Sequence, residues 1–255
     1  NNGNKIGEFM RNIRLTVEYD GGRYGGWQRL GKEESENTIE NKLLEIIKKM
    51  TGVDGEINCG CRTEVGVHAY SQVVNFKTAS ELKLTEIKRY FNRYLPMDIA
   101  VIEIEEMPER FHAALNAKSK TYLYRIAIGE VPSVFDRKFT YYCFQTPDVK
   151  TMRSAARHFV GKHDFKKFSS VKKGKSTEKE IFSIDIREED REIKIIIKAD
   201  DFLHNMARII IGTMLEIGLG KRKVEDIDAI FQPGSKEIAS VACSAQGLFL
   251  KEIEY

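Results

Sequence analysis

The 255-residue sequence lacks long apolar runs, and none approaches the roughly 18 residues that a transmembrane helix needs. Only four cysteines occur, and just two of them, Cys59 and Cys61, are close in sequence. A zinc site takes about four ligands at workable spacing, and neither a Cys-x-x-Cys pair nor a cluster of histidines accompanies these thiols. The sequence therefore predicts neither a membrane span nor a metal centre.

A signal peptide is also missing from the beginning of the chain. Residues 1–9 are polar, contain no apolar core and precede Met10, which is a natural start. We therefore interpret residues 1–9 as a non-native remnant and leave them out of the predicted fold. Without a signal peptide, the expected location is the cytoplasm.

A strong net charge is absent as well. The net charge of +3 and the isoelectric point near 8.5 are compatible with a polyanionic partner but do not require one. Positive charge is concentrated in the segment from Lys166 to Lys179, which has six lysines and one glutamate. This segment is either a solvated loop or an arm that contacts phosphates.

What the sequence does contain is a regular alternation of strand and helix patterns. Residues 14–20 place Leu15, Val17 and Tyr19 on one face, which is the period of a strand. In the first half, further strands are predicted at 72–78 and 99–105, and helices are predicted to be capped by Asn37 and Thr85. In the second half, strands are predicted at 121–128, 180–187, 192–199 and 247–255, and helices at 151–160, 202–217 and 224–231.

The order strand, helix, strand, helix, strand in each half indicates an α+β fold of two similar halves that share one sheet. No proline-rich or serine-rich linker separates the halves. We therefore expect an N-terminal half over residues 10–110, which carries the functional loop described next. A C-terminal half over residues 111–255 would complete the cleft.

The segment 59–70 (CGCRTEVGVHAY) holds the densest group of chemically useful side chains. Arg62, Glu64 and His68 supply a guanidinium, a carboxylate and an imidazole, and two glycines permit tight turns of the backbone. An arginine and a glutamate so close in a loop more often form a surface ion pair than a catalytic one. From the spacing alone, both interpretations stay open.

Two further residues stand out because of their surroundings. Arg208 interrupts the apolar helix expected at 202–217, where an unpaired charge is difficult to bury. Its partner should be distant in sequence, and the pair is either structural or holds a catalytic carboxylate in its ionised form. Tyr122 lies in an aromatic strand and is either part of the sheet core or a ring on which an exposed base stacks.

Several short motifs follow one another from about residue 13 to the C-terminus. They are EYDG at 18–21, YGGWQR at 24–29, RTEVGVHA at 62–69, QVV at 72–74, LPMDI at 95–99, FHA at 111–113, KTYLY at 120–124, GKHDFKKF at 161–168, FLHNMARIIIG at 202–212 and GLFL at 247–250. In this order they resemble the signature motifs of the TruA family of tRNA pseudouridine synthases.

The resemblance implies a pseudouridine-synthase fold with a central, mainly antiparallel sheet flanked by helices. It also implies a homodimer that binds one tRNA across two subunits, with no cofactor or metal. The implied activity is isomerisation of uridine to pseudouridine in tRNA, by family precedent at positions 38–40 of the anticodon stem-loop. Motif by motif, Glu64 is at the position of the catalytic acid and Arg62 at that of the base-flipping arginine. Tyr122 matches the tyrosine that stacks on the target base, and Arg208 matches the arginine that pairs with the catalytic carboxylate.

The sequence departs from the family pattern at the site itself. Glu64 replaces an aspartate, and Cys61 and Ser71 each replace a glycine. The extra carbon–carbon bond of glutamate moves the carboxylate by about 1.5 Å, and catalysis is sensitive to shifts of that size. Three functions therefore stay open: an active tRNA pseudouridine synthase, a catalytically impaired RNA-binding paralogue, and an active synthase retargeted to ribosomal RNA.

Overall fold

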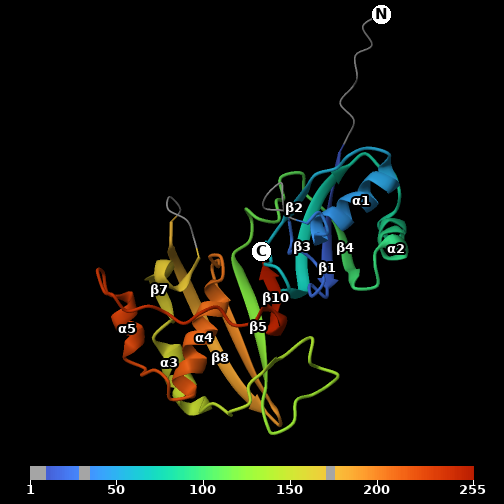
Figure 1. Cartoon of the computed structure of the whole chain (residues 1–255). Helices are drawn as coiled ribbons and strands as arrows, with labels where there is room; N and C mark the ends of the chain where they lie inside the picture. The colour runs from blue at the N-terminus through green and yellow to red at the C-terminus, as the bar shows by residue number, and fades with distance from the viewer. Residues whose placement is uncertain (1–9, 29–34, 171–175) are drawn as a thin grey trace, which may run out of the picture. The chain divides into compact units, whose positions relative to one another are not determined.

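The computed structural model describes residues 10–28, 35–170 and 176–255. The chain forms two compact units, of which the first ends at Ala117 and also includes Tyr255. The second unit spans Lys118–Glu254, and each unit combines a sheet with helices, as expected for an α+β fold (Figure 1). In the described parts of the chain, no helix is long and apolar enough to cross a membrane, and no group of three or more His, Cys, Asp or Glu side chains could hold a metal ion.

The first unit has an antiparallel sheet in which β1 lies between β4 and β3, and β2 pairs with β3. The strand predicted at the start of the chain is confirmed, because Leu15, Val17 and Tyr19 are all buried. Val17 pairs with Gln72, and a bulge after Val17 then brings Tyr19 opposite Ala69. The strands are β1 (Arg11–Tyr19), β2 (Ile57–Cys59), β3 (His68–Thr78) and β4 (Ile99–Met107).

Two helices, α1 (Ile39–Thr51) and α2 (Leu84–Tyr94), complete the first unit, and α2 packs along β4 and against α1. The predicted cap of α1 at Asn37 is wrong by one residue. Thr38 caps the helix, since its hydroxyl accepts a hydrogen bond from a main-chain N–H three residues further on. Thr85, the predicted cap of α2, already lies inside that helix. Both helices exist as predicted, but their first residues differ.

The second unit has a sheet in the order β10-β5-β9-β8-β7, in which neighbouring strands are antiparallel, and the short β6 pairs with β5 in parallel. The strands predicted at 180–187 and 192–199 are confirmed, and they pair as an antiparallel hairpin whose turn contains Asp190 with φ 49°. Ile193, Ile195 and Ile197 are fully buried on one face of β9, so this face forms the core. The strands are β5 (Ser119–Ala127), β6 (Tyr141–Tyr142), β7 (Gly161–Asp164), β8 (Glu178–Glu189), β9 (Glu192–Ala199) and β10 (Leu248–Glu254).

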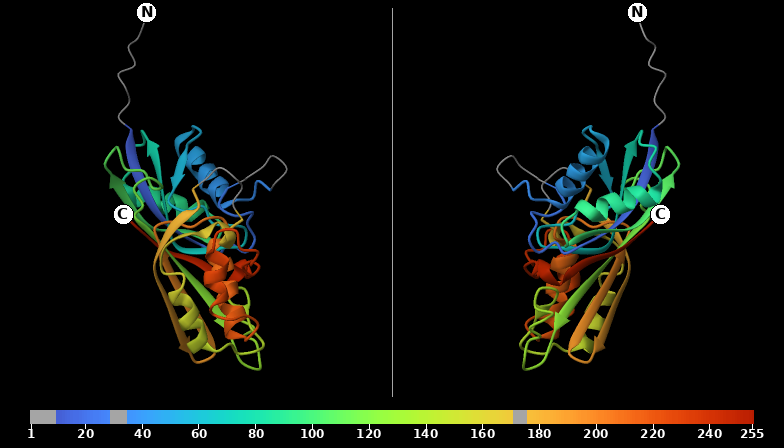
Figure 2. Two further views of the ribbon diagram at one scale, coloured as in Figure 1. Left: turned by 90° about the vertical axis from the view of Figure 1, so that its left-hand side faces the viewer. Right: turned by 90° about the vertical axis from the view of Figure 1, so that its right-hand side faces the viewer.

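In the second unit α3 packs against α4 and β8 (Figure 2). The helix predicted at 202–217 begins four residues late, because Asn205 adopts the left-handed φ of 61° and ends the preceding loop. Arg208 therefore lies in the first turn of α4 and not in the middle of an apolar helix. The helices are α3 (Val149–Arg157), α4 (Met206–Gly218), α5 (Asp226–Phe231) and the short 3₁₀ turns η1 (Phe165–Phe168) and η2 (Ala245–Gly247).

Candidate active site

Arg62 and Glu64 lie in a loop, here called the Glu64 loop (residues 60–67), which joins β2 to β3. β2 is a three-residue strand that the sequence analysis did not predict, since it is too short to show an alternation. Its pairing with β3 continues to Gly60, whose N–H donates to the Val73 carbonyl oxygen at 2.8 Å. Beyond that bond the chain leaves the sheet and carries Arg62 and Glu64 away from it.

The glycine-rich loop Gly21–Trp27 packs directly on the Glu64 loop. The Trp27 N–H donates to the Thr63 carbonyl oxygen at 2.9 Å. Gly26 has a φ of 87°, and a Cβ there would lie 3.1 Å from the Thr63 carbonyl oxygen and 3.2 Å from the Glu64 carbonyl carbon. Since only glycine allows so close an approach with this backbone conformation, the glycine-rich loop supports the main chain at Glu64. The side chain of Trp27 is fully buried, so it anchors the glycine-rich loop by packing.

Glu64 is half-buried and Arg62 is exposed. The Glu64 carbonyl oxygen accepts a bond from the Val67 N–H at 3.1 Å, which closes a turn through Gly66 with a φ of 79°. The Arg62 guanidinium lies close enough to Glu40, in the first turn of α1, for its charge to act on the Glu40 carboxyl. Burial raises the pKa of the Glu40 carboxyl, and the Arg62 guanidinium partly opposes that rise. The loop thus places a sheltered carboxylate two residues from an exposed cation.

His68 does not join Arg62 and Glu64 as a third reactive side chain. Its side chain is buried, and its Nδ1 accepts a hydrogen bond from the Gly21 N–H at 3.0 Å. Asp20 Oδ1 lies 3.0 Å from the same nitrogen. His68 therefore ties the start of β3 to the glycine-rich loop, and we assign it no role in the chemistry.

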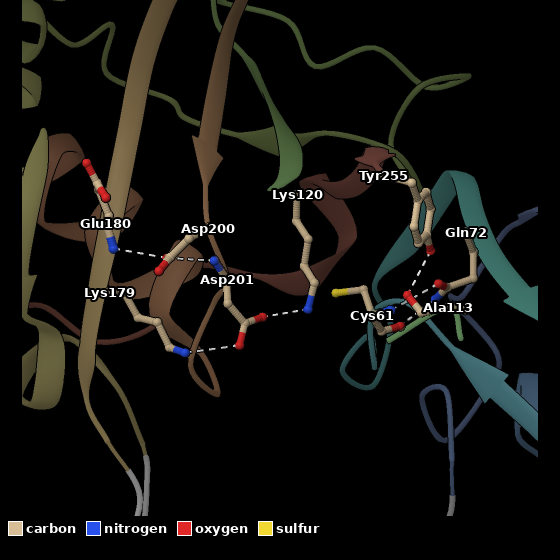
Figure 3. A network of polar contacts seen from close by, with 9 residues as sticks. All are labelled: Cys61, Gln72, Ala113, Lys120, Lys179, Glu180, Asp200, Asp201 and Tyr255. Atoms are coloured by element: carbon tan, nitrogen blue, oxygen red, sulfur yellow. Dashed lines mark hydrogen bonds and ion pairs between the residues drawn. The ribbon is translucent and has the colours of Figure 1, made fainter. Parts of the chain in front are cut away.

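Tyr122 lies in β5 of the second unit, where its buried ring packs edge-on against Phe202 with the ring centroids 4.9 Å apart. The residue before Phe202 is held by two lysines, since Asp201 contacts Lys120 Nζ at 2.5 Å and Lys179 Nζ at 3.1 Å (Figure 3). Burial raises the pKa of Asp201, but the two ammonium groups outweigh it and hold the pKa below its usual value. These contacts join β5, β8 and the loop before α4, and they orient the ring that faces Tyr122.

The ion pair between Lys179 and Asp201 also involves the lysine-rich segment from Lys166 to Lys179, of which Lys179 is the last residue. Lys179 pairs with Asp201, and Lys167 Nζ donates to the Ser235 carbonyl oxygen at 2.7 Å. These two lysines bond to the protein's own oxygen atoms. The central lysines of the segment, at 172, 173 and 175, lie outside the described residues.

Arg208 is half-buried in the first turn of α4. Its Nε donates to the Cys243 carbonyl oxygen at 2.6 Å, and its Nη1 donates to Asn205 Oδ1 at 2.9 Å. Its charge also acts on Tyr124, which shares a strand face with Tyr122. The second unit therefore places Arg208 close to Tyr124, and Tyr122 lies two residues before Tyr124 on the same face of β5.

Sequence reasoning missed the residues that support these side chains. Gln72 is a buried polar residue within an apolar strand, and that contrast was a visible signal. Asp201 and Phe202 lie in the loop before α4. The helix expected at 202–217 concealed the role of Phe202, and Asp201 directly precedes that range.

Comparison with known proteins identifies consistent relatives. The family model described as tRNA pseudouridine synthase matches residues 155–255. A tRNA pseudouridine synthase A 2 of Bacillus anthracis is 42% identical over 248 residues, which cover 96% of this chain and 100% of the relative. A tRNA pseudouridine synthase A 2 of Clostridium perfringens is 42% identical over 250 residues, with coverage of 96% and 100%. Among solved structures, a Cbf5-Nop10-Gar1 complex matches 94% of this chain and 49% of its own chain at 13% identity, with a TM-score of only 0.38.

Proposed function

Because the chain belongs to the tRNA pseudouridine synthase A (TruA) family, and so is an isomerase that converts uridine in tRNA to pseudouridine, we propose that Glu64 is its catalytic carboxylate. The observation that carries this proposal is a half-buried carboxylate on a loop whose main chain is hydrogen-bonded on both sides of the residue. A nucleophile or base needs such a fixed position more than a surface ion pair does.

The reaction breaks the N1–C1′ bond of uridine, rotates the uracil and joins C5 to C1′. C5 loses its hydrogen as a proton, and N1 gains one. A carboxylate can assist as a nucleophile at C1′ or at C6, or as a base that first removes a proton from the sugar. Glu64 has the one functional group that each of these routes requires.

The target uridine must leave the base stack to reach Glu64, and unstacking costs a few kcal/mol. We assign Arg62 to the gap that the base leaves, since Arg62 is exposed beside Glu64 on the same loop. Tyr122 is assigned to stack on the extruded base, and Arg208 to pair with the Glu64 carboxylate. These two assignments rest on the motifs around each residue.

We place the target among the uridines at positions 38–40 of the anticodon stem-loop, by family precedent.

The replacement of aspartate by Glu64 favours one competing function, an RNA-binding paralogue without turnover. Retention of Arg62, Tyr122 and Arg208 favours the enzyme, because a protein that only binds RNA does not need a base-flipping and stacking set.

In the decisive experiment, the purified protein is incubated in the presence of EDTA with unmodified tRNA whose uridines carry tritium at C5. We expect stoichiometric tritium release, with pseudouridine mapped to positions 38–40. A parallel reaction with ribosomal RNA fragments tests the retargeted synthase. Binding of tRNA without tritium release from either RNA would contradict the enzyme and support the paralogue.

We also propose that the protein is a cytoplasmic homodimer, as the family resemblance implies. Support comes from Val131, Val134 and Phe135, which expose large apolar side chains on the connection between β5 and β6, as residues at protein interfaces do. Sedimentation velocity should give twice the chain mass of 29.3 kDa. Phe135→Asp should shift the protein towards monomer, and a wild-type monomer at micromolar concentration would contradict the dimer. Cell fractionation tests the location.

A further inference from the structure

Gln72 is a fully buried side chain of β3 whose amide is saturated with hydrogen bonds. Its Oε1 accepts from the main-chain N–H of Cys61 at 3.2 Å and from that of Val73 at 3.1 Å. Its Nε2 donates to the Cys61 carbonyl oxygen at 2.5 Å and to the Tyr19 hydroxyl at 3.3 Å. Two acceptor and two donor sites are the full capacity of an amide, so its orientation is determined.

The two bonds to Cys61 continue the sheet beyond the end of its main-chain ladder. The main-chain pairing of β2 with β3 ends at the bond from Gly60 to Val73. At the next residue, the Gln72 side chain replaces a neighbouring strand and bonds both the N–H and the carbonyl of Cys61, as Figure 3 shows. The main chain that leads into Arg62 is therefore held at the last point before it leaves the sheet.

A second contact holds the chain on the other side of Arg62. The Tyr19 hydroxyl lies 2.7 Å from Thr63 Oγ1, and both side chains are buried. Because Gln72 donates to the Tyr19 oxygen, the Tyr19 hydrogen is available to Thr63. Burial also raises the pKa of the Tyr19 hydroxyl, so that it stays protonated and remains a donor. Gln72 and Tyr19 thus bracket Arg62 and fix the residue before Glu64.

We propose that Gln72 is a positioning residue for the pseudouridine reaction, and that it acts on Glu64 through the main chain of Cys61 and through Tyr19 and Thr63. The inference rests on the proposed role of Glu64. Gln72 touches neither substrate nor reacting atoms in this scheme. Its effect should therefore appear in the rate of the chemical step and not in the affinity for tRNA.

The test is Gln72→Met, which keeps the length of the side chain and removes its hydrogen bonds. We expect the single-turnover rate to fall by on the order of a hundredfold, the effect of a displacement near 1 Å, with the dissociation constant for tRNA within about twofold of wild type. Amide hydrogen exchange measured by NMR should accelerate at Cys61 but not at Gly60, whose N–H bonds to the Val73 main chain.

Asn75 provides the matched control on the same strand. It is also buried, its Oδ1 accepts from the Ala113 N–H at 2.8 Å, and its Nδ2 donates to Asn12 Oδ1 at 2.9 Å. Asn75→Leu should lower the thermal midpoint as Gln72→Met does, because each leaves buried polar groups without partners. Its single-turnover rate below the midpoint should nevertheless match that of wild type. Equal rate losses in the two variants would reduce Gln72 to a purely structural residue.

Tyr19→Phe is the second variant, in case Gln72→Met does not fold. It removes one hydroxyl and keeps the bonds between Gln72 and Cys61, so we expect a smaller loss of about tenfold in rate with unchanged tRNA affinity. Wild-type rates in both variants would overturn the positioning role and leave the catalytic role of Glu64 intact. A wild-type protein without turnover on any RNA would overturn the proposed function and this inference together.

Discussion

Glu64→Gln should abolish pseudouridine formation while leaving the affinity for tRNA within about twofold of wild type. The amide has nearly the size of the carboxylate, but it can act neither as a nucleophile of comparable strength nor as a base. We expect the single-turnover rate to fall by about three orders of magnitude or more, as when other covalent catalysts lose their nucleophile. Rates are compared on one unmodified tRNA, with binding measured separately by filter retention.

The control for charge is Glu103→Gln. Glu103 is an exposed carboxylate on β4 of the same unit, so this change removes one negative charge outside the Glu64 loop. It should leave both rate and affinity unchanged. A Glu64→Gln enzyme that works at the wild-type rate would show that another group performs the chemistry.

Arg208→Lys extends the same assay to the proposed partner of the carboxylate. Lysine keeps the positive charge but loses the planar fork that orients a carboxylate, so the rate should fall while tRNA binding persists. Full activity of this variant would contradict the pairing of Arg208 with Glu64.

Glu64→Asp should lower the single-turnover rate by on the order of a hundredfold, although it restores the residue typical of the family. Aspartate withdraws the carboxylate by about 1.5 Å. The main chain has little freedom to follow, because Gly26 packs against it and Trp27 donates to the Thr63 carbonyl oxygen. A displacement near 1 Å can reduce the rate by about a hundredfold when the reacting atoms must be aligned.

The direction of this change distinguishes two histories of the site. A slower Glu64→Asp enzyme means that the pocket is adapted to the longer acid. A faster one means that glutamate is a defect in a site built for aspartate, and it would contradict our expectation. Both enzymes should bind tRNA equally, since the carboxylate charge is retained.

The sequence by itself determined most of the longer strands, the family and the residues that we propose for the chemistry. Alternation at Leu15, Val17 and Tyr19 predicted β1. Side chains of a strand point to its two faces in turn, so burial of one face makes every second residue apolar. The strands at 180–187 and 192–199, which form β8 and β9, were predicted in the same way. The order of the motifs identified the family and singled out Glu64 as the unusual residue of this chain. The order of motifs can be read along the sequence without any distance between residues.

Only the tertiary structure decided where helices begin and what holds the Glu64 loop. Asn205 adopts the left-handed conformation, so α4 begins after it and Arg208 lies in the first turn of the helix. The apolar pattern of the sequence had predicted that the helix begins at residue 202. Gln72 and Tyr19 are 53 residues apart, and no local period links them. Periodicity records how each residue is buried, whereas hydrogen-bond partners across a sheet depend on register and on the bulge after Val17. The contacts that support the Glu64 loop are therefore a property of the folded chain.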